Sequence, residues 1–168
     1  RGNFCTADGG GRLLDRRAGR IPSERSDELV ALLDGVDAPG HRVSVHAVRD
    51  HRFVAVFHDI GSGSEASDTD PGMDGHMPLE SRPVGPDSEE LAKAVNAFVA
   101  LAHEALKGKE AQAVALRGIS SPPVLPSFPE RFGLRPAAIA AYPMYRGLAR
   151  LAGMDVLNTG RDFASELD

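Results

Sequence analysis

The pattern of apolar and polar positions at the start of the chain predicts a pair of short strands. Residues 2–7 and 12–17 have strand patterns, and the turn DGGG between them is rich in residues that accept positive φ. On the second strand Arg16 would share a face with Ala18, because side chains alternate along a strand. A spacing of four predicts that Arg20 lies on the same face as Arg16, in a strand or in a helix. Residues 41–60 predict two more strands, and the apolar run FVAVF is typical of a central one.

Helical spacing of apolar residues predicts two helices between these strands and the second half of the chain. The first covers residues 26–36, with Ser26 as its cap. The second opens at Asp87, stops at Gly108 and has the clearest helical pattern in the sequence. Its apolar residues recur at helical spacing: Leu91, Val95, Phe98, Ala102 and Leu106.

Strand and helix patterns then alternate to the end of the chain. Strand patterns occur in AVALRG, AAIAAY and MDVLN. Two helix starts are indicated as well, because Ser127 and Glu130 have capping-box spacing and Pro143 suits the first residue of a helix. Such alternation favours parallel strand pairs. The expected fold class is therefore α/β: a mixed sheet flanked by helices, in a single compact domain that covers residues 1–168.

A long glycine- and proline-rich loop, residues 58–87, interrupts this pattern. It holds five glycines and four prolines and shows no periodicity. A loop of that length in a compact domain is usually functional or disordered. We expect it to lack regular backbone pairing and to be the most mobile part of the chain.

Composition narrows the class of protein. The chain has 168 residues, 42% of them hydrophobic, and a formal charge of −5, which argues against a nucleic-acid binder. No apolar run approaches a membrane span, so no membrane partner is expected. The single cysteine, Cys5, cannot form an internal disulfide, which favours the cytoplasm, and it reads as a small core residue. The start RGNFCTAD, without an initiator methionine, suggests a piece cut from a longer protein.

The stretch DRRAGR is the first candidate for chemistry. Arg16, Arg17 and Arg20 surround an Ala-Gly pair, and guanidinium groups grip phosphate or carboxylate through paired hydrogen bonds. Arg117 ends a predicted strand, which is where ligands of open α/β sheets gather. The alternatives are a solvated basic turn and an arginine that merely solvates the sheet rim.

The loop motif SDTDP is the second candidate. Asp68 and Asp70 could hold a hard metal, assisted by Asp74 or His76, or Asp70 could face a substrate. The alternative is a turn device, because Asp before Pro is common in turns. The six histidines form no ligand set, and neither a Gly-x-Ser-x-Gly elbow nor a phosphate-binding Gly-rich loop is present, so no catalytic residue is assigned.

Seven motifs of the chain follow one another in the order found in a single family. They are RGNFCTAD, LLDRRAGRI, HRFVAVFH, SDTDP, VALRGISSPP, FPERFGLRPAAIAA and YRGLARLAGMDV. In these motifs the chain resembles the archaeal-type 2,3-bisphosphoglycerate-independent phosphoglycerate mutases of the alkaline phosphatase superfamily, from Arg1 to about Val156. Members are more than twice as long. The resemblance implies a cytoplasmic glycolytic isomerase that interconverts 2- and 3-phosphoglycerate through a phosphoserine on a metal-binding core.

The core motifs of that family are missing from this sequence. The resemblance therefore implies the inserted, substrate-gripping domain alone, without mutase activity of its own and without a cofactor. Two divalent metals, manganese or magnesium with zinc as a further option, would belong to the parent's core. Partners would be phosphoglycerate and that phosphatase-like core. The residues that the resemblance implies to face substrate are Arg1, Arg16, Arg17, Arg20, Asp70 and Arg117.

Two departures from the family pattern keep alternatives open. NTGRDFASELD stands where a GATG-like stretch is usual, and SDTDP is followed by GMDGH. The chain could therefore belong to a related enzyme acting on another small phosphorylated metabolite. It could also be a non-catalytic regulatory or assembly module that kept the fold and lost the chemistry.

Overall fold

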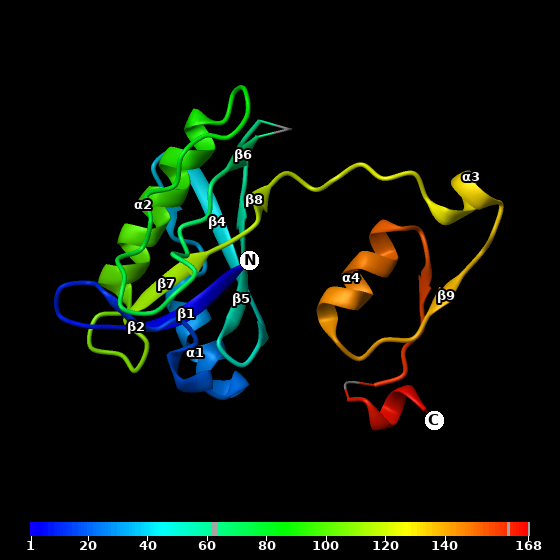
Figure 1. Cartoon of the computed structure of the whole chain (residues 1–168), viewed down its shortest axis with the longest axis horizontal. Helices are drawn as coiled ribbons and strands as arrows, with labels where there is room; N and C mark the ends of the chain where they lie inside the picture. The colour runs from blue at the N-terminus through cyan, green and yellow to red at the C-terminus, as the bar shows by residue number, and fades with distance from the viewer. Residues whose placement is uncertain (62–63, 161, 168) are drawn as a thin grey trace. The chain divides into compact units, whose positions relative to one another are not determined.

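The computed structural model describes residues 1–61, 64–160 and 162–167 (Figure 1). The sequence predicts one domain, whereas the contacts within the chain gather in two compact units, Arg1–Ser121 and Pro122–Asp168. The boundary falls in the proline-rich stretch around residues 121–127.

The first unit is built on an antiparallel sheet in which β1 is the shared strand. The order is β2-β1-β5-β4-β3, and β7 pairs with β1 as well. A second, two-stranded antiparallel sheet joins β6 to β8. The strands are β1 (Gly2–Ala7), β2 (Leu13–Asp15), β3 (Asp37–Ala38), β4 (His41–Arg49), β5 (Arg52–Phe57), β6 (Glu65–Ala66), β7 (Ala113–Leu116) and β8 (Ile119–Ser120).

The expected strands are confirmed, but not all of their partners. The central position of β5 is correct, since it lies between β1 and β4. One of its faces is open, because Val54 and Val56 are 37% and 39% exposed. The expectation of parallel pairs is wrong for β7, which runs antiparallel to β1 from the register Gly2↔Leu116 to Cys5↔Ala113.

Helices α1 (Ser23–Leu33) and α2 (Glu89–Ala105) lie in this unit, as Figure 1 shows in blue and green. The apolar stripe predicted for α2 is buried throughout. Helix α1 begins three residues earlier than expected, directly after Pro22, whose φ of −59° suits a helix entry. Ser26 is therefore a buried residue inside the helix and not its cap.

Side-chain alternation along β1 divides the apolar residues into two clusters. Phe4 belongs to the larger cluster with residues of α1 and α2, whereas Cys5 belongs to a smaller one with Leu13, Ala113 and Ala115. Burial raises the pKa of the Cys5 thiol to about 12. Cys5 is thus the core residue that the sequence predicted, since a neutral buried thiol behaves as a small hydrophobe.

The expectation that residues 58–87 lack regular backbone pairing is wrong. Strand β6 lies inside this segment, Ser67 N donates to Arg82 O over 2.8 Å, and Leu79 N donates to Thr69 O over 2.8 Å. Ser81 also exchanges hydrogen bonds with the Asn96 side chain on α2. Serine side chains add to this pairing, since Arg82 N donates to Ser67 Oγ and Ser81 Oγ donates to Ser67 O. Residues 62 and 63 of this segment are outside the described residues.

In the second unit, the capping signal predicted for a helix is present in the structure. Ser127 Oγ accepts from Glu130 N and the Glu130 carboxylate accepts from Ser127 N, so the capping box is confirmed. Strands β9 and β10 pair in parallel on either side of α4 in the chain. The elements are α3 (Phe128–Phe132), β9 (Ala137–Ala138), α4 (Pro143–Leu151), β10 (Asp155–Val156) and the 3₁₀ turn η2 (Ala164–Glu166).

The α/β class with flanking helices is therefore confirmed, with antiparallel pairs in the first unit and a parallel pair in the second. In the part of the chain that the structure describes, no helix combines the length and the apolar character needed to cross a membrane.

Candidate functional site

Strand β1 brings together two of the five arginines that the sequence singled out, from segments that lie far apart in the chain. Residue Arg117 follows β7 and donates its backbone N–H to Arg1 O over 2.8 Å. The other arginine, Arg16, follows β2, and its carbonyl accepts from the Asn3 side chain over 3.3 Å. Because β2 and β7 both pair with β1, the residues that follow them meet near the start of β1.

A third segment, residues 68–74, joins them through Thr69. This side chain is fully buried, and its hydroxyl accepts from Leu116 N over 2.8 Å. In return Thr69 N donates to Leu116 O over 2.9 Å. Thr69 thus pairs with the last residue of β7, and the aspartates on either side of it are carried to the arginines.

Asp70 is the centre of this arrangement. Its side chain is fully buried and accepts two hydrogen bonds from Arg16 Nη1, at 2.8 and 3.1 Å, and one from Gly72 N at 2.9 Å. Its Oδ2 also lies 3.9 Å from Arg117 Nε. These hydrogen bonds raise the pKa of Arg16 above its ordinary value. A buried carboxylate is tolerated where charge and lone pairs are satisfied in this way.

Two further aspartates form ion pairs with the same arginines, without a hydrogen bond to either Nε. Asp74 Oδ1 accepts from Arg16 N over 3.0 Å and lies 3.3 Å from Arg16 Nε. Asp68 accepts from Gly118 N over 2.8 Å and lies 3.5 Å from Arg117 Nε. From the sequence pattern, both aspartates were candidates only for metal binding. No pattern in the chain links them to arginines 58 and 49 positions away.

A metal at SDTDP finds little support in this geometry. The carboxylates of Asp68, Asp70 and Asp74 are directed at guanidinium and backbone N–H groups. Among the described residues, no group of three or more His, Cys, Asp or Glu side chains is placed to hold a metal ion.

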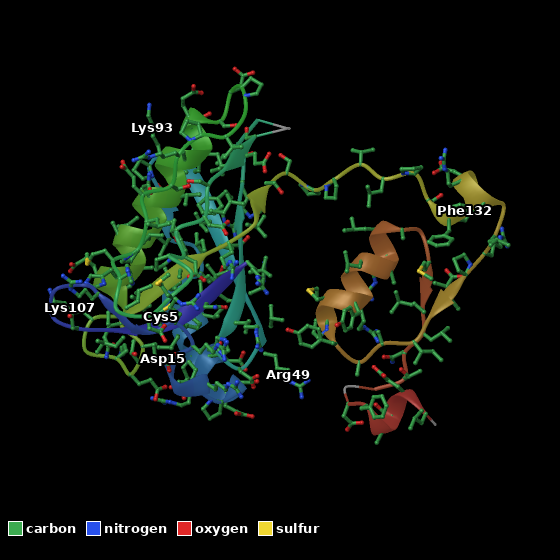
Figure 2. All side chains as sticks on the ribbon, in the orientation of Figure 1. Cys5, Asp15, Arg49, Lys93, Lys107 and Phe132 are labelled. Carbon is green, nitrogen blue, oxygen red and sulfur yellow. The ribbon has the colours of Figure 1, made fainter. Side chains whose placement is uncertain are left out.

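The DRRAGR stretch is a left-handed turn and not the end of a strand. Strand β2 stops at Asp15, and Ala18, Gly19 and Arg20 have φ of 45°, 62° and 58°. The Asp15 carboxylate accepts from Gly19 N over 2.7 Å and from Arg17 N over 2.8 Å. These bonds, led by the one from Gly19, lower the pKa of Asp15. Figure 2 shows Asp15 and Cys5, which lie on the paired strands β2 and β1.

The predicted sharing of a face by Arg16 and Arg20 therefore fails, because the strand ends before either residue. Arg17, Arg20 and Arg1 are exposed, and in the described residues no partner is found for their side chains. Three left-handed residues in a row, two of them not glycine, cost free energy that only a supported turn tolerates. The structure thus separates two held arginines, Arg16 and Arg117, from three open ones.

Guanidinium hydrogens remain available in the held pair. Within residues 1–61, 64–160 and 162–167, no hydrogen bond is found for Nη2 of Arg16 or for Nη1 and Nη2 of Arg117. The two Nη groups of one arginine form the fork that binds both oxygens of a carboxylate or phosphate. Such a fork is left on Arg117, whereas Arg16 has Nη2 alone, since its Nη1 is bonded to Asp70.

A family model described as "2,3-bisphosphoglycerate-independent phosphoglycerate mutase" matches residues 1–112, two thirds of the chain. The chain belongs to this family. A relative from Aquifex aeolicus named "Probable 2,3-bisphosphoglycerate-independent phosphoglycerate mutase" is 39% identical over 179 residues, covering 100% of this chain and 44% of the relative. A relative of the same name from Thermus thermophilus is 42% identical, covering 94% of this chain and 39% of its own length.

A solved structure supports the same assignment. The cofactor-independent phosphoglycerate mutase from Thermoplasma acidophilum has a TM-score of 0.67 at 27% identity, over 93% of this chain and 45% of that one. The PH0037 protein from Pyrococcus horikoshii, with a TM-score of 0.63 at 20% identity, shows the fold alone. The chain thus spans about two fifths of the length of these mutases, and the resemblance drawn from its motifs is confirmed at the level of the family.

Proposed function

We propose that this chain is the substrate-gripping part of a cytoplasmic, cofactor-independent phosphoglycerate mutase. The observation that carries the proposal is the pair Arg16 and Arg117, held by one buried carboxylate, with Nη groups left for a ligand. Phosphoglycerate bears a carboxylate and a phosphate, the two oxyanions that guanidinium groups bind best. The names of the mutases that share this chain's sequence and fold support that substrate class.

The residues of this chain would bind and orient, and would not carry the chemical step. In a mutase the glycerate must stay bound and turn while its phosphoryl group is held elsewhere. Arg117 offers a two-pronged contact and Arg16 a single one through Nη2. The exposed Arg1, Arg17 and Arg20 add positive charge that attracts the ligand.

The phosphoryl-accepting serine and two divalent metals would belong to a phosphatase-like core, the partner of this chain in the full-length enzyme. Metal ions in such a core would stabilise the charge on the transferred phosphoryl group. The described residues of this chain offer no group of ligands for them. No step of the reaction is therefore assigned to metal within this chain.

Titration of the full 168-residue chain with 3-phosphoglycerate tests the proposal. We expect weak binding, with a Kd of roughly 1 mM, corresponding to about −4 kcal/mol. Arg16→Ala should weaken it about 10-fold or more, because a hydrogen bond to a charged group contributes about 1.5–3 kcal/mol. The matched control is Arg25→Ala, since Arg25 lies on α1 and pairs with Glu28 and Glu110.

The same titration separates the alternatives. Binding of another small phosphorylated acid, with 3-phosphoglycerate inert, would point to a related enzyme. Absence of binding by either ligand, at unchanged fold, would contradict the proposal and favour a regulatory or assembly module.

A further inference from the structure

We propose that Asp68 and Asp74 are positioning residues that aim Arg117 and Arg16 at the bound oxyanion. The inference deepens the proposed function and rests on it. Neither residue is placed to receive an anionic ligand itself. Both act through the arginines they contact, so the specificity of the grip would be set by carboxylates that never touch the substrate.

The two aspartates share one geometry. Each uses a single carboxylate to accept a backbone N–H and to lie beside a guanidinium Nε. For Asp74 the N–H and the Nε both belong to Arg16, at 3.0 and 3.3 Å. For Asp68 the N–H belongs to Gly118, at 2.8 Å, and the Nε to the adjacent Arg117, at 3.5 Å. The backbone bond anchors the carboxylate, so the guanidinium meets a fixed charge.

The segment that carries these aspartates is anchored on both sides. Gly75 N donates to Leu13 O over 2.7 Å and Leu13 N donates to His76 O over 2.9 Å, which holds Asp74 beside β2. Thr69 pairs with Leu116, which holds Asp68 beside the end of β7. Each aspartate therefore sits next to the strand that leads into its own arginine.

Stability alone gives no reason for these two contacts. The side chains of Asp68 and Asp74 are 41% and 56% exposed, and ion pairs at such positions contribute little to folding. Asp70 differs, since its side chain is fully buried. The outer carboxylates would instead select one guanidinium orientation from several, in which Nε faces the aspartate. Nη2 of Arg16 and both Nη groups of Arg117 are then left for a ligand, while Nη1 of Arg16 stays on Asp70. Pre-ordering of this kind lowers the entropy cost of binding.

The opposing account is that these carboxylates only compete with an anionic ligand for the arginines. The two accounts predict opposite changes in the affinity for an anion when the aspartate is removed. Removing a competitor would tighten anion binding, whereas removing a positioning contact weakens it. Asp74→Asn separates charge from geometry, because it loses the negative charge but keeps an oxygen that accepts from Arg16 N.

The experiment titrates 3-phosphoglycerate and, separately, inorganic phosphate into the full chain and its Asp74→Ala, Asp74→Asn and Asp27→Ala variants. Asp27 is an exposed residue of α1 and serves as the matched control. We expect Asp74→Ala to weaken 3-phosphoglycerate binding about 10-fold, with Asp74→Asn within about 3-fold of the parent chain. Equal or tighter binding by Asp74→Ala, at an unchanged melting temperature, would overturn the proposal.

If the chain binds no phosphoglycerate, the proposed function is refuted. A second readout, which needs no ligand, then still tests the positioning role. The Nε–H resonance of Arg16 reports side-chain order by NMR without any ligand. It should show a rigid side chain in the parent chain and the Asp27→Ala control, and a mobile one in Asp74→Ala. An equally rigid Arg16 in Asp74→Ala would overturn the positioning role.

Discussion

Two proline-rich segments of this chain, residues 64–87 and 121–127, pack in opposite ways. The first buries Ser64, Thr69 and Ser81 to within 3% exposure, and it pairs with strands and helices of its unit. The second has no regular structure, and its Val124 is 99% exposed. The difference lies in the polar side chains, because hydroxyl and carboxylate groups can satisfy backbone N–H groups where proline and glycine cannot.

The largest effect is expected for the buried carboxylate of the first segment. Asp70→Ala leaves the Arg16 side chain, only 19% exposed, without its closest partner. Breaking a buried ion pair from one side commonly costs about 3–5 kcal/mol. Urea denaturation should show a loss in the free energy of unfolding near the lower end of this range, and below about 1 kcal/mol for the half-exposed Asp74→Ala. Equal losses in the two variants would show that burial does not distinguish these aspartates.

Hydrogen exchange compares the two segments directly. Amide hydrogens of Ser67, Thr69 and Leu79 donate to backbone carbonyls, whereas Val124 and Leu125 lie in the exposed segment. We expect at least about 100-fold slower exchange in the first group, or about 2.7 kcal/mol of extra protection. Amides of α2 provide the internal reference. Similar fast exchange in both segments would restore the view of residues 58–87 as the most mobile part of the chain.

A smaller effect is expected at Thr69. Thr69→Val keeps the shape of the side chain but removes the oxygen that accepts from Leu116 N. A buried N–H left without an acceptor costs about 1–3 kcal/mol. Thermal unfolding should show this loss for Thr69→Val and little change for Thr6→Val, where the side chain is half-buried on β1. A stable Thr69→Val variant would mean that the segment is held mainly by other contacts.

The smallest effect concerns pH and the arginine turn. The pKa of Asp15 is lowered by hydrogen bonds from Gly19 N and Arg17 N, so its ionised form is favoured in the folded state. Its contribution is therefore fully present above the unfolded pKa of about 3.9 and is lost as the pH falls through the folded value. Asp15→Ala should lower stability by about 1 kcal/mol at neutral pH, with the difference shrinking below about pH 4. Urea titrations at both pH values measure it, with Asp27→Ala as control, and a constant difference would contradict the assignment.

Much of the fold follows from local signals in the sequence. The apolar stripe of α2 and the Ser127–Glu130 capping box are complete within a few turns of chain, so their prediction needs no knowledge of distant residues. The parallel pairing expected of β7 failed because strand direction depends on which strand it meets. That strand is β1, more than 100 residues away in the chain.

The candidate site was predictable only in part, for the same reason. The arginines stood out by their clustering and by the position of Arg117 after a strand. The carboxylates that contact them are distant in the chain. Asp70 lies 54 positions from Arg16, and Asp68 lies 49 positions from Arg117. The end of β2 at Asp15 was also not predictable from the local pattern, because the strand ends where the Asp15 carboxylate accepts a hydrogen bond from Gly19 N in the following turn.

The grip proposed for Arg117 is tested most directly in the full-length mutase that we propose, with this chain as its substrate-gripping part. Arg117→Lys keeps the charge but loses the two-pronged grip, and Arg117→Ala loses both. Loss of a positioned charged contact costs on the order of 2–4 kcal/mol, so mutase turnover by Arg117→Ala should fall about 30- to 1000-fold. Hydrolysis of a simple phosphate ester, which needs no grip on glycerate, should fall much less. An unchanged mutase rate, or equal loss of both activities at an unchanged melting temperature, would contradict the account.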